Sequence, residues 1–176
     1  MTTKLTAITL ALAMVSSSSL ATSPATALRC VVQAPARAMV GQPVLLRFTV
    51  TNTGPTPLQV LRWNTPFEGA WFAPFVEVKR DGKALPFQGP MIKRAEPSAE
   101  NYLRFDAGQS IDAELDLALP FDLSKPGHYR VQPRLRLIDV FVDTGSEAKA
   151  PRARSEHQGA DLACPAVEFK LASPKG

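Results

Sequence analysis

Strict alternation of apolar and polar residues is the feature that most constrains the fold of this chain. In "VLLRFTVTN" (44–52) large apolar residues fall on every second position, and the pattern recurs in "IDAELDLAL" (111–119) and "YRVQPRLRL" (129–137). Successive side chains of a strand point to opposite faces, so this pattern is typical of half-buried strands in an antiparallel sheet. No segment after residue 28 shows a helical 3.6-residue period, and we therefore expect an all-β fold.

Turn signals separate the alternating segments. "NTGPTP" (52–57), "DAGQS" (106–110) and "SKPG" (124–127) are rich in turn-forming residues, and Asp81-Gly82 is a strong signal for a two-residue hairpin. The 16 prolines suit short strands joined by ordered turns. Such spacing predicts an immunoglobulin-like antiparallel β-sandwich. "KPGHYRV" (125–131) supports this, because a Gly-x-Tyr that enters a strand is similar to the tyrosine corner of such domains.

The first 27 residues have the organisation of a signal peptide. Lys4 precedes an apolar run over 5–15, and Ala25 and Ala27 offer small side chains for a cleavage site. A cleavage site after Ala21 is an alternative. The run is too short to span a bilayer, so we expect export to the periplasm or the cell exterior, no membrane insertion, and one domain over residues 28–176.

The two cysteines, Cys30 and Cys164, lie near the ends of the exported chain. In an oxidising compartment such a pair predicts a disulfide, which would close most of the chain into one loop and contribute about 5 kcal/mol at most. Two unrelated thiols are the alternative, and a metal site has too few ligands. Cys30 could also be lipidated, but Arg29 stands where a lipidation signal requires a small residue.

Composition argues against several classes of function. The formal net charge is +4, and acids are interspersed with the basic residues, so no nucleic-acid surface is expected. His128 and His157 are the only histidines and lack zinc-ligand spacing. "FVDTGSEA" resembles the catalytic turn of aspartic proteases, but Asp143 is a single copy followed by basic residues, and we interpret it as a turn.

A stripe of acids alternates along one predicted strand, and a stripe of arginines alternates along another. Asp112, Glu114 and Asp116 would spread over roughly 13 Å, too far to wrap one calcium ion. If the two strands are neighbours, we expect the acids to pair across the sheet with Arg130, Arg134 and Arg136. We therefore predict no catalytic residues, no cofactor and no metal.

Several separated motifs carry a resemblance to a known family. They are Trp63-Asn64-Thr65-Pro66, Gly69, Arg80-Asp81-Gly82, Gly89-Pro90-Met91, Lys93-Arg94, Asp122-Leu123-Ser124 and Pro126-Gly127-x-Tyr129. Over about Val44 to Gln132 the chain resembles the non-catalytic N-terminal domain of peptidyl-Lys, deuterolysin-like (aspzincin) metalloendopeptidases.

The resemblance implies a β-sandwich propeptide that docks on a zinc protease domain. In that family the protease domain carries His-Glu-x-x-His and a downstream Asp, and neither motif follows Gln132 here. No zinc ligand or catalytic Glu can be carried over. What the resemblance implies for this chain is a stand-alone domain, expected to be a monomer, whose partner is a zinc metalloendopeptidase.

We expect the partner to be contacted by residues 61–72 and 88–96. Rigid aromatic side chains lose little entropy on binding, and a lysine-directed protease would offer an acidic pocket. The predicted contacts are Trp63, Asn64, Phe67, Trp71, Phe72, Met91, Lys93 and Arg94. Alternatively Trp63 fills the core, Phe67 and Trp71 pack inside, and Lys93 and Arg94 belong to a solvated loop.

These observations predict a secreted, propeptide-like domain that inhibits a zinc metalloendopeptidase by loop insertion or assists its folding. A non-enzymatic adhesion or scaffold module of the envelope with the same fold is the alternative. Residues 144–160 have almost no large apolar side chain, and we expect a flexible insertion there.

Overall fold

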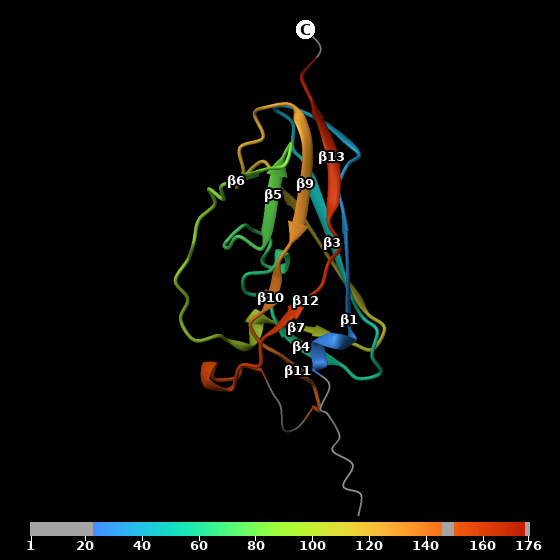
Figure 1. Cartoon of the computed structure of the whole chain (residues 1–176). Coiled ribbons are helices and arrows are strands. Elements are labelled where there is room, and N and C mark those ends of the chain that lie inside the picture. The colour runs from blue at the N-terminus through green and yellow to red at the C-terminus, as the bar shows by residue number, and fades with distance from the viewer. Residues whose placement is uncertain (1–22, 146–149, 175–176) are drawn as a thin grey trace, which may run out of the picture.

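The computed structural model of the chain describes residues 23–145 and 150–174 (Figure 1). The described residues form strands and short 3-10 turns. The strands are β1 (Leu28–Gln33), β2 (Arg37–Met39), β3 (Leu45–Asn52), β4 (Leu58–Leu61), β5 (Val76–Arg80), β6 (Lys83–Leu85), β7 (Tyr102–Phe105), β8 (Ser110–Asp116), β9 (Gly127–Pro133), β10 (Leu135–Leu137), β11 (Val140–Val142), β12 (Ala160–Leu162) and β13 (Val167–Ala172). The turns are η1 (Pro24–Ala27), η2 (Pro66–Glu68), η3 (Ala99–Asn101) and η4 (Arg154–Glu156).

The strands assemble into the predicted immunoglobulin-like β-sandwich. A five-stranded sheet has the order β2-β13-β9-β5-β6, and a three-stranded sheet has the order β1-β3-β8. Two smaller sheets, β11-β4-β7 and β10-β12, lie at the lower end in Figure 1. Strand pairing is antiparallel except between β2 and β13, which run parallel.

The sandwich core follows from the alternation. Leu46, Phe48 and Val50 of β3 are at most 1% exposed, and on β9 Tyr129 and Val131 are equally buried. The residues between them face solvent, so each strand contributes one apolar face to a shared core. The predicted inward faces of these strands are confirmed.

The strand expected over residues 129–137 is interrupted, and so is the C-terminal strand segment. Residues 129–137 divide into β9 and β10, with Pro133 at the end of β9, and the last strand divides into β12 and β13 around Pro165. Proline has no N–H to donate to a ladder, so a strand can leave one sheet and enter another at such a residue. These interruptions create the small sheet β10-β12.

The predicted Asp81-Gly82 hairpin and the predicted tyrosine corner are both confirmed. Asp81 and Gly82 both adopt positive φ, 48° and 80°, between β5 and β6, as a tight hairpin of the favoured twist requires. The Tyr129 hydroxyl donates a hydrogen bond of 2.6 Å to the carbonyl of Lys125, which is the bond of a tyrosine corner.

The predicted disulfide joins Cys30 of β1 to Cys164 of the β12–β13 connection. The two Cα atoms are 5.0 Å apart, and the bridge closes a sequence separation of 134. It therefore links the first and last parts of the described fold.

The expected pairing of the acidic and arginine stripes was wrong. β8 lies beside β3, so Asp112 pairs with Arg47 at 3.0 Å, whereas Arg130 pairs with Glu168 of β13 at 2.8 Å. The stripes lie in different sheets because β8 and β9 are not neighbours. Asp143 is a turn residue, as we interpreted it, because its Oδ1 accepts a 3.0 Å hydrogen bond from the Gly145 amide.

Parts of two predictions lie outside the described residues. Most of the expected signal peptide falls in residues 1–22, and the expected insertion contains residues 146–149. The described residues of the first segment pack on the sandwich: Ala25 of η1 is buried, and the carbonyl of Ala27 accepts a 2.7 Å hydrogen bond from the Thr53 amide. Among residues 23–145 and 150–174, no helix has the length and apolar character to cross a membrane.

Candidate functional site

The segment from Trp63 to Phe72 is a fixed turn rather than a loose loop. Thr65 is fully buried and caps η2, accepting a 3.3 Å hydrogen bond from the amide of Phe67. Gly69 ends the turn with a φ of 75°, a left-handed conformation that glycine adopts without a Cβ clash. Asn64 also has positive φ, 58°, which asparagine tolerates better than most residues.

Both tryptophans of this segment are buried. Trp71 is 4% exposed, stacks on Phe75 with ring centroids 4.6 Å apart, and donates its Nε1–H to the carbonyl of Asp116 at 2.8 Å. Trp63 is 7% exposed and packs in a second apolar cluster with Leu61, Tyr102 and Phe141. Both rings pack beneath the surface of this segment. This agrees with the alternative in which the two tryptophans belong to the core.

Phe67 and Phe72 are half-buried. Phe67 packs against the main core, with its ring edge-to-face with Phe105 at 6.1 Å. The ring of Phe72 instead lies beneath the guanidinium of Arg94.

The guanidinium of Arg94 connects this turn to the long loop of residues 86–98. Its central carbon lies 5.1 Å from the Trp63 ring centroid and 5.7 Å from that of Phe72. It also forms a 2.7 Å ion pair with Glu68, whose side chain is 6% exposed and accepts a 2.7 Å hydrogen bond from the Asn64 amide. A charge-assisted pair between two aromatic faces is a strong local anchor. Arg94 is therefore an anchor of the loop rather than a solvated residue.

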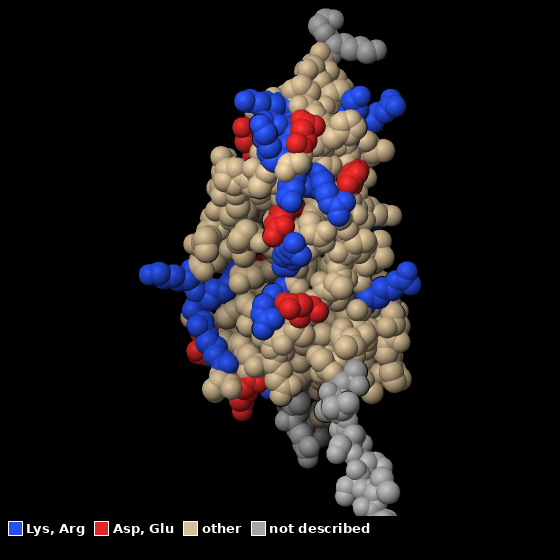
Figure 2. Space-filling view, in the orientation of Figure 1, with Lys and Arg blue, Asp and Glu red and all other residues tan. Residues whose placement is uncertain are grey.

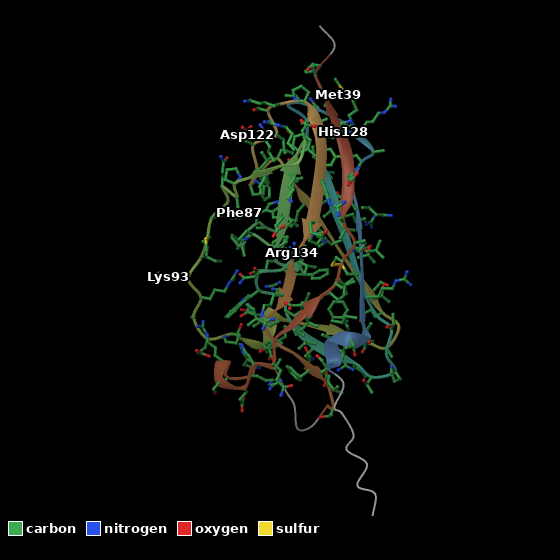
Figure 3. All side chains as sticks on the ribbon, viewed as in Figure 1. Met39, Phe87, Lys93, Asp122, His128 and Arg134 are labelled. Carbon is green, nitrogen blue, oxygen red and sulfur yellow. A yellow bond between two sulfur atoms is a disulfide. The ribbon has the colours of Figure 1, made fainter. Side chains whose placement is uncertain are left out.

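The tip of the same loop projects into solvent. Met91 is 79% exposed and Ile92 44% exposed, and Lys93 is exposed as well. Figure 3 shows Lys93 at the outermost part of this loop, away from the sheets. The loop therefore presents two neighbouring apolar side chains and a lysine to solvent.

The described part of the 144–160 segment forms a second support. The Arg154 side chain pairs with Glu96 at 3.2 Å and donates to the carbonyl of Arg94 at 2.6 Å and to that of Ala95. Its central carbon lies 5.9 Å from the Trp63 ring centroid. The loop is thus fastened from two sides, by η2 and by η4.

The 150–160 segment is itself held by a buried carboxylate. Asp139 is fully buried and accepts hydrogen bonds of 2.9 Å from the Tyr102 hydroxyl and from the Gln158 amide. Arg152 lies 3.4 Å from it, with its central carbon 4.8 Å from the Phe141 ring centroid. Burial and the bond to Asp139 raise the pKa of Tyr102 to about 12.

A shallow cavity of about 320 Å³ separates the loop from the body. It is lined by Trp63, Asn64, Ile92, Arg94, Ile138, Arg154 and His157. A second cavity of about 450 Å³ continues from it across β10, sharing Asn64, Ile138 and His157. The lining supplies apolar surface and hydrogen-bond donors, which suits a peptide more than a metal.

Charges of both signs cover the visible face around this site. In Figure 2 the Lys and Arg side chains run down that face with Asp and Glu side chains beside them. Arg134 pairs with Glu77 at 3.2 Å and Arg136 with Asp161 at 3.0 Å, so each strand cation near the second cavity has an acidic partner. Within the described ranges, no group of three His, Cys, Asp or Glu side chains could hold a metal ion.

The structure therefore divides the predicted contact residues into three sets. Met91 and Lys93 lie at the surface, whereas Trp63, Trp71 and Arg94 hold that surface in place, with Asn64, Phe67 and Phe72 half-buried between them. Glu68 and Arg154 hold the loop in place and were not among the predicted residues. Glu68 could have been suspected, because it is the one acid in the stretch "LRWNTPFEGAWFAPF".

The comparisons with known proteins point to extracellular proteases. The chain is 34% identical over 117 residues to an extracellular protease of Aeromonas hydrophila, 35% identical over 89 residues to a neutral protease 2 homolog of Blastomyces gilchristii, and 28% identical over 133 residues to a neutral protease 2 homolog of Coccidioides posadasii. These matches cover 66%, 49% and 73% of this chain. No family model matches the sequence.

The similarity reaches only part of each protease. The matched region covers 32% of the Aeromonas protein, 24% of the Blastomyces protein and 37% of the Coccidioides protein. Among solved structures, the CARDB domain of a Pyrococcus furiosus protein is 12% identical, with a TM-score of 0.33, covering 84% of this chain and 94% of that domain. A β-glucosidase from Listeria innocua is 12% identical, with a TM-score of 0.32, covering 82% of this chain and 16% of the enzyme. The chain is thus similar in sequence to about a quarter to a third of several extracellular or neutral proteases.

Proposed function

We propose that this chain is an exported, non-enzymatic β-sandwich domain that binds a zinc metalloendopeptidase. Binding blocks the cleft of the enzyme or assists its folding, and the contact is made by the loop of residues 88–96. The observation that carries the proposal is the part-length similarity to proteases, 34% over 117 residues covering 32% of the Aeromonas protein. Because the similarity reaches only about a third of that protease, we infer that the shared region is a domain that accompanies the catalytic domain and is not the catalytic domain itself.

The geometry of the loop supports this role. Binding through a flexible segment loses free energy because the segment must be ordered, whereas a segment ordered beforehand avoids most of that cost. Glu68 and Arg154 fix the base of the loop, so Met91 and Lys93 are presented without a large entropy loss. Lysine and methionine on one rigid loop can enter a narrow cleft that has an acidic pocket.

Binding and inhibition assays test the proposal. The purified protein is titrated calorimetrically into a deuterolysin-type metalloendopeptidase, and inhibition of peptide hydrolysis is followed in parallel. We expect a 1:1 complex whose Kd rises by at least about tenfold when Met91 and Lys93 are both changed to Ala, as is typical of interface anchors.

The matched control is Arg130→Ala, which removes an exposed charge on β9 and should leave the Kd unchanged. Absence of binding to every protease of this type would contradict the proposal and favour the adhesion or scaffold alternative.

A further inference from the structure

The indole N–H of Trp63 has no hydrogen-bond acceptor among the described residues. Trp71 donates its Nε1–H to the carbonyl of Asp116, whereas that of Trp63 has no partner although the residue is only 7% exposed. In the described ranges no fully enclosed side-chain nitrogen or oxygen lacks a partner, so this N–H must reach open space. Trp63 lines the cavity of about 320 Å³ behind the loop. Because a buried tryptophan N–H usually has a partner, this cavity offers a donor that a ligand can use.

The side-chain amide of Asn64 is a second donor at the same place. Asn64 lines both cavities. Its backbone amide donates a 2.7 Å hydrogen bond to Glu68, but the described structure contains no hydrogen bond of its side chain. A side-chain amide carries two N–H donors. The residue therefore presents free donors where the two cavities meet.

The charged residues that line the two cavities are all basic. Arg94 and Arg154 line the first cavity, and Arg134 and Arg136 line the second, which Figure 3 shows for Arg134 on the body of the sandwich. No acidic residue of the described chain lines either cavity. Each of these arginines has an acidic partner, and all four partners lie outside the lining. The lining therefore favours a ligand with negative charge.

The arginines of the second cavity can exchange their partners for a ligand. The side chains of Arg134 and Arg136 are more than half exposed, and so are those of their partners Glu77 and Asp161. Ion pairs in such positions contribute little to stability. A guanidinium also carries five N–H donors, more than one carboxylate can accept. A carboxylate that enters the cavity therefore finds donors without breaking a contact on which the fold depends.

Apolar side chains lie beside these donors. Ile92 and Ile138 line the first cavity, and Ala73, Pro74 and Phe75 line the second. The two volumes, about 320 and 450 Å³, fall within the range of roughly 300–1,000 Å³ that is common for ligand sites. Because both cavities are shallow and share part of their lining, they suit an extended chain that crosses from one to the other.

We propose that the two cavities form one binding groove for an acidic peptide segment of a partner protein. A carboxylate of the peptide accepts hydrogen bonds from the Trp63 indole and the Asn64 amide, and a neighbouring apolar side chain packs on Phe75. The carboxylate belongs to an aspartate or glutamate side chain or to a free C-terminus. The groove does not rest on the proposed function, because Met91 and Lys93 line neither cavity.

Calorimetric titration with short synthetic peptides tests the groove. The first peptide has a glutamate between two leucines and blocked termini, the second has glutamine in place of that glutamate, and the third is the second with a free C-terminal carboxylate. We expect the first or the third to bind with a Kd at least about tenfold lower than that of the neutral peptide, and the tighter of the two identifies the source of the carboxylate. Equal affinity of all three peptides, or binding of none, would overturn the inference.

The indole resonances report the contact directly. The chain has two tryptophans, so a nitrogen–proton correlation spectrum contains two indole signals, and Trp63→Phe identifies which is which. The Trp71 N–H is already bonded to a carbonyl. Only the Trp63 signal should therefore move downfield as the carboxylate peptide is added. Movement of the Trp71 signal alone, or of neither signal, would contradict the proposed contact.

Variants of the lining are compared with an ion pair elsewhere on the sheet. Asn64→Gly removes the amide while glycine tolerates the positive φ, and it should raise the peptide Kd about tenfold. Arg136→Gln should raise it about threefold, because an exposed charge is screened. The matched control is Arg130→Gln, which removes another exposed arginine and its pair with Glu168, outside both cavities. Melting curves show that each variant is folded, and lining variants that bind like the control would place the site elsewhere.

The loop variant separates the groove from the proposed function. The chain with Met91 and Lys93 both changed to Ala should bind the peptide as tightly as the original chain. If this variant loses the peptide, the peptide does not lie in the cavities behind the loop and the inference is wrong. If it keeps the peptide while the original chain binds no metalloendopeptidase, the proposed function fails and the groove stands.

Discussion

Arg94 shows at the scale of one residue what a sequence can and cannot reveal. Its position beside Lys93 was enough to suggest a contact, but its partner Glu68 lies 26 residues away, and no local spacing connects them. For Trp63 and Trp71 the sequence suggested a contact that the structure does not place at the surface. Aromatic residues around a proline turn are compatible with a docking surface and with a core, and burial decided for the core. Side chains of an irregular segment do not alternate in direction along the sequence. The alternation that located the strand residues therefore could not tell whether these two tryptophans are buried or exposed.

Substitutions of Trp71 and of Lys93 should distinguish a residue that stabilises the fold from a residue that contacts the protease. Trp71→Ala removes a buried ring stacked on Phe75 and should lower the free energy of unfolding by about 3–5 kcal/mol. Lys93→Ala removes an exposed side chain and should change it by no more than about 0.5 kcal/mol, while weakening protease binding. Chemical denaturation of both variants measures the difference, and equal losses of stability would contradict the division of the site.

The two tyrosines should ionise at unusually high pH. Burial raises the pKa of both Tyr102 and Tyr129, that of Tyr102 to about 12 from its ordinary 10.0. Because these pKa values are higher in the folded than in the unfolded chain, the stabilisation is complete below about pH 10 and is lost as the pH rises toward 12. Ultraviolet absorbance of phenolate measures this directly. A native-state midpoint at pH 10 would mean that neither phenol is buried as described.

The elements of the fold were predictable to different degrees. β3, β8 and β9 carry long alternations and were identified, and the β5–β6 hairpin followed from its Asp-Gly turn. The three-residue strands β2, β11 and β12 are too short for a period to be visible, and they form because neighbouring strands offer unpaired backbone groups. In the site, the exposed loop was predictable, but its fastening by η4 was not, because the 144–160 segment has the composition of a mobile insertion.

The contacts of η1 predict where a signal peptidase would cleave the chain. Ala25 is 6% exposed, and the Ala27 carbonyl accepts hydrogen bonds from both the amide and the hydroxyl of Thr53. Cleavage after Ala27 would remove these contacts, whereas cleavage after Ala21 would preserve them. We therefore expect the exported protein to begin before Pro24. N-terminal sequencing or intact mass gives the answer, and a mature chain starting at Leu28 would show that η1 is dispensable.

At the scale of the whole molecule, we expect the single disulfide to stabilise the folded chain substantially. The bridge between Cys30 and Cys164 restrains most of the unfolded chain, and the loop-entropy relation gives about 5 kcal/mol as an upper figure for a loop of this length. The double variant Cys30→Ala, Cys164→Ala should therefore melt well below the original chain but, given the buried core on both sheets, retain a cooperative transition. Calorimetry measures both, and an unchanged melting temperature would show that the bridge adds nothing.

The architecture as a whole presents one loop from a rigid sandwich, with η2 on one side and η4 on the other. The central claim is that this loop binds a zinc metalloendopeptidase. The most direct measurement is a calorimetric titration of the purified domain into a deuterolysin-type metalloendopeptidase, repeated with Met91 and Lys93 both changed to Ala. The account predicts a 1:1 complex that inhibits the enzyme and that the double variant weakens at least about tenfold. No heat of binding, or equal affinity of the original chain and the double variant, would contradict it.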